Sequence, residues 1–463
     1  MRAVVALLLL SLIVCIPLGY AEEREQGQLD LDTVETLDLH TAQQYALQGN
    51  PNMAAARTRI AQARARIQQV IAAWWPSLDL SAAAENERVS DNTHAYNSLL
   101  ASLYGGEAEQ DSNQFSAGIQ ATWLLFDGFA RHFQKQQAEC GEQAYRFAFI
   151  NAQRLLVQAV AEAYFNAQLA QTKIDIALAD KKFYKRQLED AQSRFDIGAG
   201  TWGDVINIKV QLNSAETSFI LNKRELEASC YGLAALLGVP EARLPEKMRL
   251  QVLDKDTEIH PFREDVAALI DEALESRPDL QQAREQARQA ESEVGLAKAS
   301  FYPTAQLQGY IAAARGDDPA FTNDDFGNQI SLNIAWNIFS GGADRALLAE
   351  ARQAKREGQY FLNSLRNQIA SEVRQGIARL RAFEDQVRLQ RETVILVEEN
   401  RELAKNEYEA GETSLVRLNE AQRDLTTTYG RLAQALVGYF RARQNLDSVT
   451  GRNLSGIVSA GQE

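Results

Sequence analysis

The sequence predicts a mainly α-helical protein in which long antiparallel helical hairpins of coiled-coil character join four β-strands of the membrane-spanning type. Three observations lead to this prediction. The chain of 463 residues runs twice through one order of sequence signals. Each half contains two segments in which apolar and polar residues alternate, as in a strand with one apolar face. Each half also contains a long proline-free stretch of helical periodicity.

The two halves share landmarks in the same order. The first half contains Asn50-Pro51, Trp75-Pro76, Phe126-Asp127-Gly128 and Gly198, and the second contains Arg277-Pro278, Tyr302-Pro303, Phe339-Ser340-Gly341 and Gly411. The first two pairs are 227 residues apart and the last two are 213 apart. The change falls in an interval that holds loops, where length varies at little cost. We therefore predict two repeats, residues 22–240 and 265–451, joined by residues 241–264.

The N-terminus has the pattern of a secretory signal peptide, residues 1–21. Arg2 precedes an apolar run that ends in the small-x-small sequence Gly19-Tyr20-Ala21. An uncleaved anchor is the alternative, but the run is about 16 residues and a spanning helix needs about 20. Lipid attachment at Cys15 is less favoured, because Val14 precedes it where such sites have a small residue.

Each repeat is expected to begin with one helix, over residues 41–73 and 265–299. Both segments are rich in Ala, Gln and Arg, and each ends just before a proline that cannot continue a helix.

Four strands are expected after these helices, at residues 75–86, 115–126, 303–312 and 329–339. The clearest runs from Phe115 to Leu125, where every second residue is apolar and those between are Ser, Gly, Gln and Thr; Ile330 to Ile338 repeats the pattern. A soluble sandwich would alternate in the same way. The strand lengths favour a bilayer, as do aromatic residues near the strand ends, namely Trp74, Trp75, Trp123, Tyr302 and Trp336. Polar loops are expected over about 86–114 and 313–328. Because about eight strands are needed to close a barrel, several chains would have to share one.

Long helices are predicted for residues 129–195 and 342–409, and shorter return helices for 202–238 and 415–450. Gly198 and Gly411 end the long helices. Thr201 and Asp204 have the spacing of a capping box, and Ser414 occupies the matching place in the second repeat.

The composition gives no indication of an enzyme, a metal site or a cofactor. The four histidines are scattered, Cys140 and Cys230 are isolated and fit helix packing, and no nucleophile elbow or phosphate loop is present. The net charge of −14 argues against a nucleic-acid partner. A hidden catalytic site is one alternative. A periplasmic coiled-coil structural or adaptor protein is another, but it would not explain four strands placed alike in both halves.

With these landmarks the chain resembles the outer membrane efflux protein family, the TolC-like channels. The resemblance runs from Leu37-Asp38-Leu39 and Gly49-Asn50-Pro51 to Thr450-Gly451. It implies a homotrimer whose twelve strands close one barrel in the outer membrane and whose helices form a periplasmic tunnel. It also implies a periplasmic adaptor and an inner-membrane transporter of the RND or ABC type. The exported substrate is left open. By the same analogy residues 241–264 form an equatorial belt, and residues 452–463, by their composition, a flexible tail.

The resemblance places the two helical turns at the periplasmic entrance. Glycine and hydroxyl residues of the turns are the expected adaptor contacts: Gly198, Gly200, Thr201, Gly411, Thr413 and Ser414. The family's acidic entrance positions fall on Arg417 and Glu420, so a base replaces one acid here. We expect Arg417 to pair with Asp204 or Glu420 in the closed mouth; a solvated arginine and a capping Asp204 are the alternatives. The strand-end aromatic residues are expected to be anchors at the lipid interface.

Overall fold

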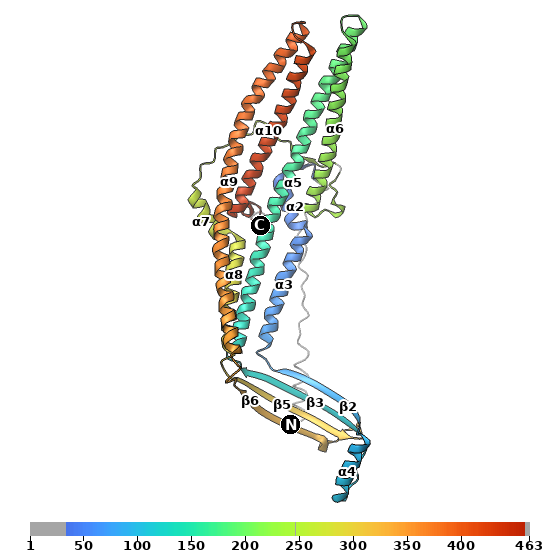
Figure 1. Cartoon of the computed structure of the whole chain (residues 1–463), viewed down its shortest axis with the longest axis vertical. Coiled ribbons are helices and arrows are strands. Elements are labelled where there is room, and N and C mark those ends of the chain that lie inside the picture. The colour runs from blue at the N-terminus through green and yellow to red at the C-terminus, as the bar shows by residue number, and fades with distance from the viewer. Residues whose placement is uncertain (1–33, 246, 459–463) are drawn as a thin grey trace.

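The computed structural model describes residues 34–245 and 247–458. The expected signal peptide lies outside these ranges. The molecule is long and narrow, with helical hairpins running from a sheet at one end to two turns at the other (Figure 1). None of the helices in the described ranges is both long and apolar enough to cross a membrane.

The two repeats have the same elements in the same order, apart from one extra helix. The first comprises α2 (Leu39–Gly49), α3 (Pro51–Ala72), β2 (Ser77–Arg88), α4 (Asp91–Leu103), β3 (Asp111–Phe126), α5 (Ala130–Asp196) and α6 (Trp202–Leu237). The second comprises α7 (Val266–Ser276), α8 (Pro278–Ala299), β5 (Thr304–Gly316), β6 (Phe326–Ala335), α9 (Ala343–Glu409) and α10 (Leu415–Thr450). Both long helices have 67 residues and both return helices have 36. At 1.5 Å per residue a long helix extends about 100 Å.

The helices expected over 41–73 and 265–299 are each broken in two, which corrects the prediction. Asn50 and Arg277 are extended, at ψ 122° and 123°, and each precedes a proline that begins the next helix. The reason is steric, because a residue before proline is disfavoured in the helical region.

The loop expected over 86–114 is also corrected, since it contains α4. The predicted tail is helical as far as the structure describes it, with a 3-10 turn, η4 (Arg452–Leu454), and then α11 (Ser455–Val458). The Arg452 guanidinium there bonds to Glu264 and Glu272. The sequence did not predict this ordered tail, because an ion pair between residues far apart in the chain produces no periodic pattern.

The strands differ from the predicted ranges mainly at their ends. β3 begins at Asp111, not 115, and β5 continues to Gly316, because backbone pairing reaches beyond the alternating segment. β6 ends at Ala335, so Trp336 and Ile338 lie outside it. Trp336 lies instead in the turn that leads toward α9, and its indole N–H donates to the Phe301 carbonyl at 3.2 Å.

The sheet is antiparallel in the order β2-β3-β5-β6, so β3 and β5 join the two repeats. Its register aligns the alternating residues of all four strands. One face carries the rows Leu80–Ile119–Ile311–Asn328 and Leu78–Ala121–Gly309–Ile330, which are apolar except at Asn328, and the other carries the rows Asp79–Gln120–Tyr310–Gln329 and Ser77–Thr122–Gln308–Ser331. Large apolar side chains of the first face are exposed, among them Leu80 at 80% and Ile330 at 83%. Apart from pairing with β3 and β5, the outer strands β2 and β6 have no neighbour among the described residues.

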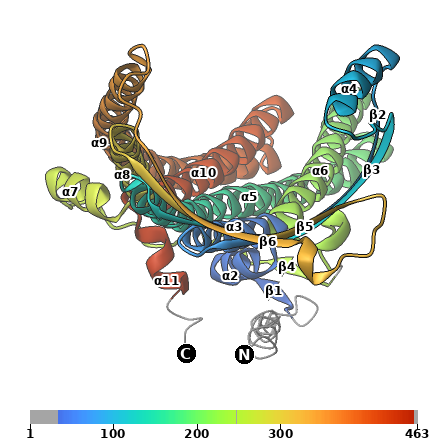
Figure 2. The same cartoon turned by 90° about the horizontal axis from the view of Figure 1, so that it is seen from below.

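Helices and sheet follow a common arc when seen from below, with α2, α7 and α11 on its outer side (Figure 2). A short parallel pair, β1 (Thr36–Leu37) and β4 (Arg249–Leu250), lies with α2 at mid-height. The fully buried Tyr164 of α5 donates its hydroxyl to the Leu37 carbonyl at 3.1 Å. Gln168 and Gln171 of α5 donate to the carbonyls of Gln251 and Leu250, so part of the segment expected as an equatorial belt is packed against the long helix.

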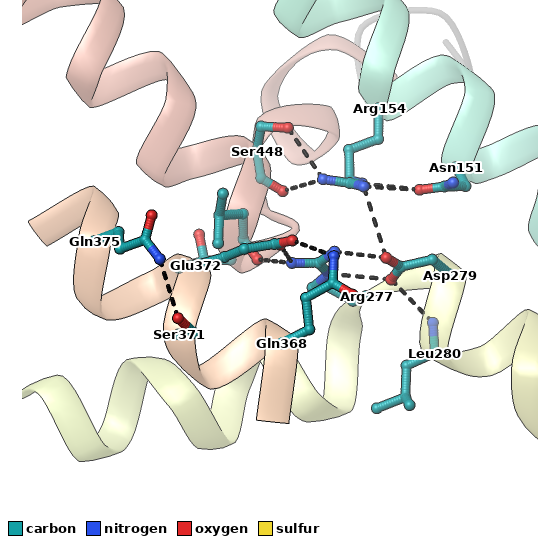
Figure 3. A network of polar contacts seen from close by, with 12 residues as sticks. Asn151, Arg154, Arg277, Asp279, Leu280, Gln368, Ser371, Glu372, Gln375 and Ser448 are labelled. Atoms are coloured by element: carbon teal, nitrogen blue, oxygen red, sulfur yellow. Dashed lines mark hydrogen bonds and ion pairs between the residues drawn. The ribbon is translucent and has the colours of Figure 1, made fainter. Parts of the chain in front are cut away.

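A buried polar network joins the two repeats where α8 begins (Figure 3). Arg277 contacts Asp279 and Glu372 at 2.5 Å each. Arg154 of α5 donates to the Ser448 carbonyl of α10 at 2.9 Å and lies 3.9 Å from Asp279. Both arginine side chains are nearly inaccessible, at 6% and 3% exposure. The network ties α5, α8, α9 and α10 together at one height.

Candidate functional site

The end of the molecule opposite the sheet carries two helical turns built alike. Gly198 and Gly411 have φ of +76° and +78°, a region that favours glycine. In each turn the next backbone amide bonds back to the fifth residue before it, Ala199 to Arg194 and Glu412 to Glu407, at 2.8 Å in both. This is the left-handed C-terminal cap expected at both positions.

Hydroxyl residues start both return helices. The Thr201 hydroxyl accepts from the Asp204 amide at 3.2 Å and donates to the Asp204 carboxylate at 2.8 Å. Ser414 accepts from the Arg417 amide at 3.4 Å. Thr201 is therefore the N-cap of α6, and the Asp204 carboxylate is bonded to the capping hydroxyl. Arg417 occupies the equivalent place in the second repeat, 213 residues on, where a cation is unfavourable near a helix N-terminus.

The Arg417 guanidinium turns back along its own hairpin and contacts Asn400 Oδ1 at 3.2 Å. Within the part of the chain that the structure describes, no ion pair joins Arg417 to Asp204 or Glu420. A pair of this kind stays a prediction for the assembled entrance.

Apolar and aromatic contacts hold the two turns together within one chain. Leu415, at the start of α10, is 6% exposed and packs in a cluster with Val205 and Ile208 of α6 and with Tyr184 of α5. Its counterpart in the first repeat, Trp202, is exposed, and its ring lies 5.3 Å from the Phe195 ring with the two planes tilted at 48°. The second turn is thus anchored against the first hairpin.

Tyr408 and Arg194 form a further contact between the hairpins that the sequence did not indicate. The Arg194 guanidinium lies 5.3 Å from the centre of the Tyr408 ring. Burial raises the pKa of the Tyr408 hydroxyl; Arg194 acts to lower it, and Asp204 and Asp190 raise it further. In the sequence Tyr408 looks like any other apolar packing residue near the end of a helix. The contact with Arg194 is seen only in the tertiary structure.

A polar bridge between the hairpins lies further from the turns. The carboxylate of Asp180, on α5, accepts from Gln422 Nε2 at 2.8 Å and from the Thr426 hydroxyl at 3.0 Å, both on α10. Arg401 of α9 donates to Gln422 Oε1 and stacks over Phe183 at 5.2 Å. These residues are spread over three helices and share no sequence motif.

The aromatic residues expected at a membrane interface gather at the helical end of the sheet. The Trp123 indole donates to the Trp74 carbonyl at 3.0 Å, as Trp336 does to Phe301 in the second repeat. Tyr302 lies edge-on to Phe129 at 6.1 Å. Trp75 is 72% exposed and Trp336 is 61% exposed. The indole N–H groups of Trp123 and Trp336 are satisfied inside the chain, so these rings present their apolar bodies outward.

A model of the family described as outer membrane efflux protein matches residues 42–239 and 269–452. The chain belongs to this family.

Proteins of related sequence or structure match most of the chain. Nodulation protein T of Rhizobium leguminosarum bv. trifolii is 24% identical over 402 residues, 83% of each protein. The cation efflux system protein CusC of Escherichia coli K12 is 26% identical over 410 residues, 86% of this chain and 82% of CusC. The solved CmeC outer membrane channel of Campylobacter jejuni has the same fold, with a TM-score of 0.77, 18% identity and coverage of 92% of this chain and 89% of CmeC.

Family membership establishes the location and the general role. The chain is an efflux channel component of the bacterial outer membrane, with most of its residues in the periplasm. The matched ranges begin and end close to the two structural repeats, so both repeats belong to the family unit.

Proposed function

We propose that three copies of this chain close one twelve-stranded barrel in the outer membrane and extend their hairpins as a tunnel through which substrates leave the periplasm. The sheet carries the argument. It has one apolar and one polar face, both outer edges are without a neighbour in the described chain, and four strands are too few to close. Open edges of ten and twelve residues would otherwise pair indiscriminately.

The mass of the purified protein in detergent and its conductance in a planar bilayer test this proposal together. A mass of three chains and uniform single-channel openings are expected. A monomer that shows no conductance would favour a periplasmic coiled-coil protein without channel activity.

The turns at the far end are the proposed docking site for a periplasmic adaptor that connects the tunnel to an inner-membrane transporter of the RND or ABC type. The residues proposed as contacts are Gly198, Gly200, Thr201, Gly411, Thr413 and Ser414. Ile197, which is 80% exposed, adds an apolar side chain to the first turn. A photocrosslinking residue at position 413 is expected to link the chain to a co-expressed adaptor. A crosslink formed only from a probe at the sheet end of the molecule would contradict this docking site.

The substrate class stays open, because the relatives differ in what their names state. CusC is named for cation efflux, AprF of Pseudomonas aeruginosa for secretion of alkaline protease, and ArpC of Pseudomonas putida for antibiotic efflux. Because channels of one family are named for such different substrates, we expect the inner-membrane transporter, and not the tunnel, to choose the substrate.

Arg417, Asp204 and Glu420 are proposed to set the charge of the entrance. Three-fold symmetry would bring three Arg417 side chains near one another, which favours pairing with a carboxylate of the same or a neighbouring chain. Arg417→Asp places a carboxylate where Asp204 stands in the first repeat and should increase the preference for cations, while Arg417→Ala should change conductance. Single-channel recording with unequal salt on the two sides measures both. If Arg417→Ala conducts and selects ions as the parent does, Arg417 does not set the charge of the entrance.

A further inference from the structure

Helix α4 is the element by which the two repeats differ. The offset between matched landmarks falls from 227 to 213 across the strand-loop-strand interval, a difference of 14 residues, and α4 has 13. The corresponding loop of the second repeat has only a 3-10 turn, η3 (Asn323–Asp325). The extra residues of the first repeat therefore form a defined helix at the end of the sheet far from the periplasmic hairpins (Figure 1).

α4 is attached firmly to the strands beneath it. The Val89 amide extends the ladder by bonding to the Gln110 carbonyl at 2.9 Å, and the Gln110 side chain donates to Asp91 at 2.6 Å. The Ser90 hydroxyl caps the helix at Thr93, and Gly105, at φ +75°, ends it. The direction of the helix is thus set by β2 and β3.

The apolar side chains of α4 point away from their own chain. His94, Ser98 and Ala101 lie on one side of the helix, at about 100° per residue, and are the half-buried positions. The apolar side chains lie on the opposite side and are exposed: Tyr96 62%, Leu99 64%, Leu100 41% and Leu103 73%. A helix that packs on its own chain has the reverse arrangement. We call these four residues the α4 stripe.

The α4 stripe lies beside the open edge of the sheet. β2 is an outer strand, and its last residue, Arg88, is three residues before α4. β6, the other outer strand, begins at the same end of the sheet with Phe326, which is 51% exposed and lies 6.4 Å from the Phe321 ring. Antiparallel pairing of β2 with β6 of another copy would bring these aromatic rings next to α4. Figure 2 shows α4 over the β2 end of the arc, away from its middle.

We propose that the α4 stripe packs against the β5–β6 loop of the neighbouring copy, around Phe321 and Phe326, and stabilises the contact between subunits at the end of the barrel far from the periplasmic hairpins. This inference rests on the proposed shared barrel. The occupant is protein and not a lipid surface on grounds of charge. The segment from Val89 to Gln110 contains no Lys or Arg but has Asp91, Glu107 and Glu109, whereas helices that bind membrane surfaces are rich in basic residues.

Disulfide trapping tests the contact in a background in which Cys140 and Cys230 are changed to serine. Leu99→Cys combined with Phe321→Cys should yield covalently linked trimers on mild oxidation. Ser98→Cys with Phe321→Cys is the matched control from the covered side of α4 and should not link. Dimers from Leu99→Cys alone would mean that α4 helices meet each other, and would overturn the proposal.

A second measurement uses side chains that keep the helix intact. Leu99→Gln/Leu103→Gln replaces half of the stripe with a good helix former and should lower the midpoint of trimer dissociation by about 2–4 °C. Asn97→Gln/Ser102→Gln adds the same residue outside the stripe and should leave it unchanged. An unchanged midpoint in the stripe variant, with no crosslink, would overturn the proposal. A parent protein that is not a trimer in detergent would instead contradict the proposed function.

Discussion

Arg277 illustrates how single residues hold the repeats together. Burial acts to raise the pKa of the Asp279 carboxyl, but the hydrogen bond and charge of Arg277, with the charge of Arg154, outweigh it, and the pKa lies below its usual value. The ionised carboxylate therefore stabilises the fold above the unfolded pKa, and this contribution is lost as pH falls through the lower folded pKa. Asn50 is the counterpart of Arg277 in the first repeat. It donates to the Leu236 carbonyl at 2.8 Å, as Arg277 donates to that of Val449 at 3.4 Å.

Arg277→Ala should reduce the free energy of unfolding by about 3 kcal/mol, because it leaves two carboxylates without their partner in a mostly buried site. Arg388→Ala is the control, since Arg388 is 65% exposed and, among the described residues, forms an ion pair with Asp385 alone; it should cost less than about 1 kcal/mol. Chemical denaturation followed by circular dichroism measures both. Equal losses would mean that the network adds nothing beyond a surface pair.

Asp180 has the opposite dependence on pH. Burial raises its pKa, although the Gln422 and Thr426 hydrogen bonds act to lower it. A raised folded pKa means that the protonated form favours the fold, so this stability is present below the unfolded pKa and is lost as pH rises through the folded one.

Asp180→Asn should therefore be at least as stable as the parent at pH 7, with the difference vanishing near pH 3, because the amide oxygen still accepts both hydrogen bonds. Thermal midpoints of parent and variant across this range give the result. A variant that is less stable at pH 7 would show that the charge itself holds α5 to α10.

At the level of helices and strands, individual glycines determine how closely two helices pack. A Cβ at Gly438 of α10 would lie 2.3 Å from the Phe383 ring of α9, whereas one at Gly430 of the same helix would meet nothing within 4 Å. The two positions differ only in what faces them.

Gly438→Ala should destabilise the chain by about 1–3 kcal/mol through overpacking. Gly430→Ala should stabilise it by about 0.5–1 kcal/mol through helix propensity. Opposite shifts of the unfolding midpoint are expected from the same substitution. Stabilisation by both would mean that the Phe383 ring moves aside freely.

Secondary structure was predictable from the sequence where one signal dominates. The long helices and the turns at Gly198 and Gly411 follow from periodicity and glycine, and the structure has them within two residues of the expected ranges. The breaks at Asn50 and Arg277 were missed although both prolines were visible, because the helical pattern continues on either side. α4 was missed because it is short and lies between polar segments, although six of its thirteen residues are apolar.

The whole molecule is a curved segment whose sheet exposes apolar residues on one face, and adjacent residues of β6 test which face meets lipid. Ile330 lies on the apolar face opposite Gly309, and Gln329 lies on the polar face opposite Tyr310.

Ile330→Lys should hinder assembly in the membrane by about 2–4 kcal/mol if it lies near the bilayer midplane, since lysine is costly there. Gln329→Lys should assemble normally and change single-channel conductance, because its side chain would face the lumen. Recovery of trimer from outer-membrane extracts and bilayer recording distinguish them. Normal trimer yield for Ile330→Lys would place the apolar face away from lipid.

Sequence alone determined the duplication, the long helices, the four alternating strands and the turns, because each depends on residues near one another in the chain. The tertiary structure decided which distant residues meet. It joined β3 to β5, placed Arg154 beside Asp279, set Tyr408 against Arg194 and turned Arg417 toward Asn400. Such contacts depend on how helices about 100 Å long cross and pack, and no local period records that geometry.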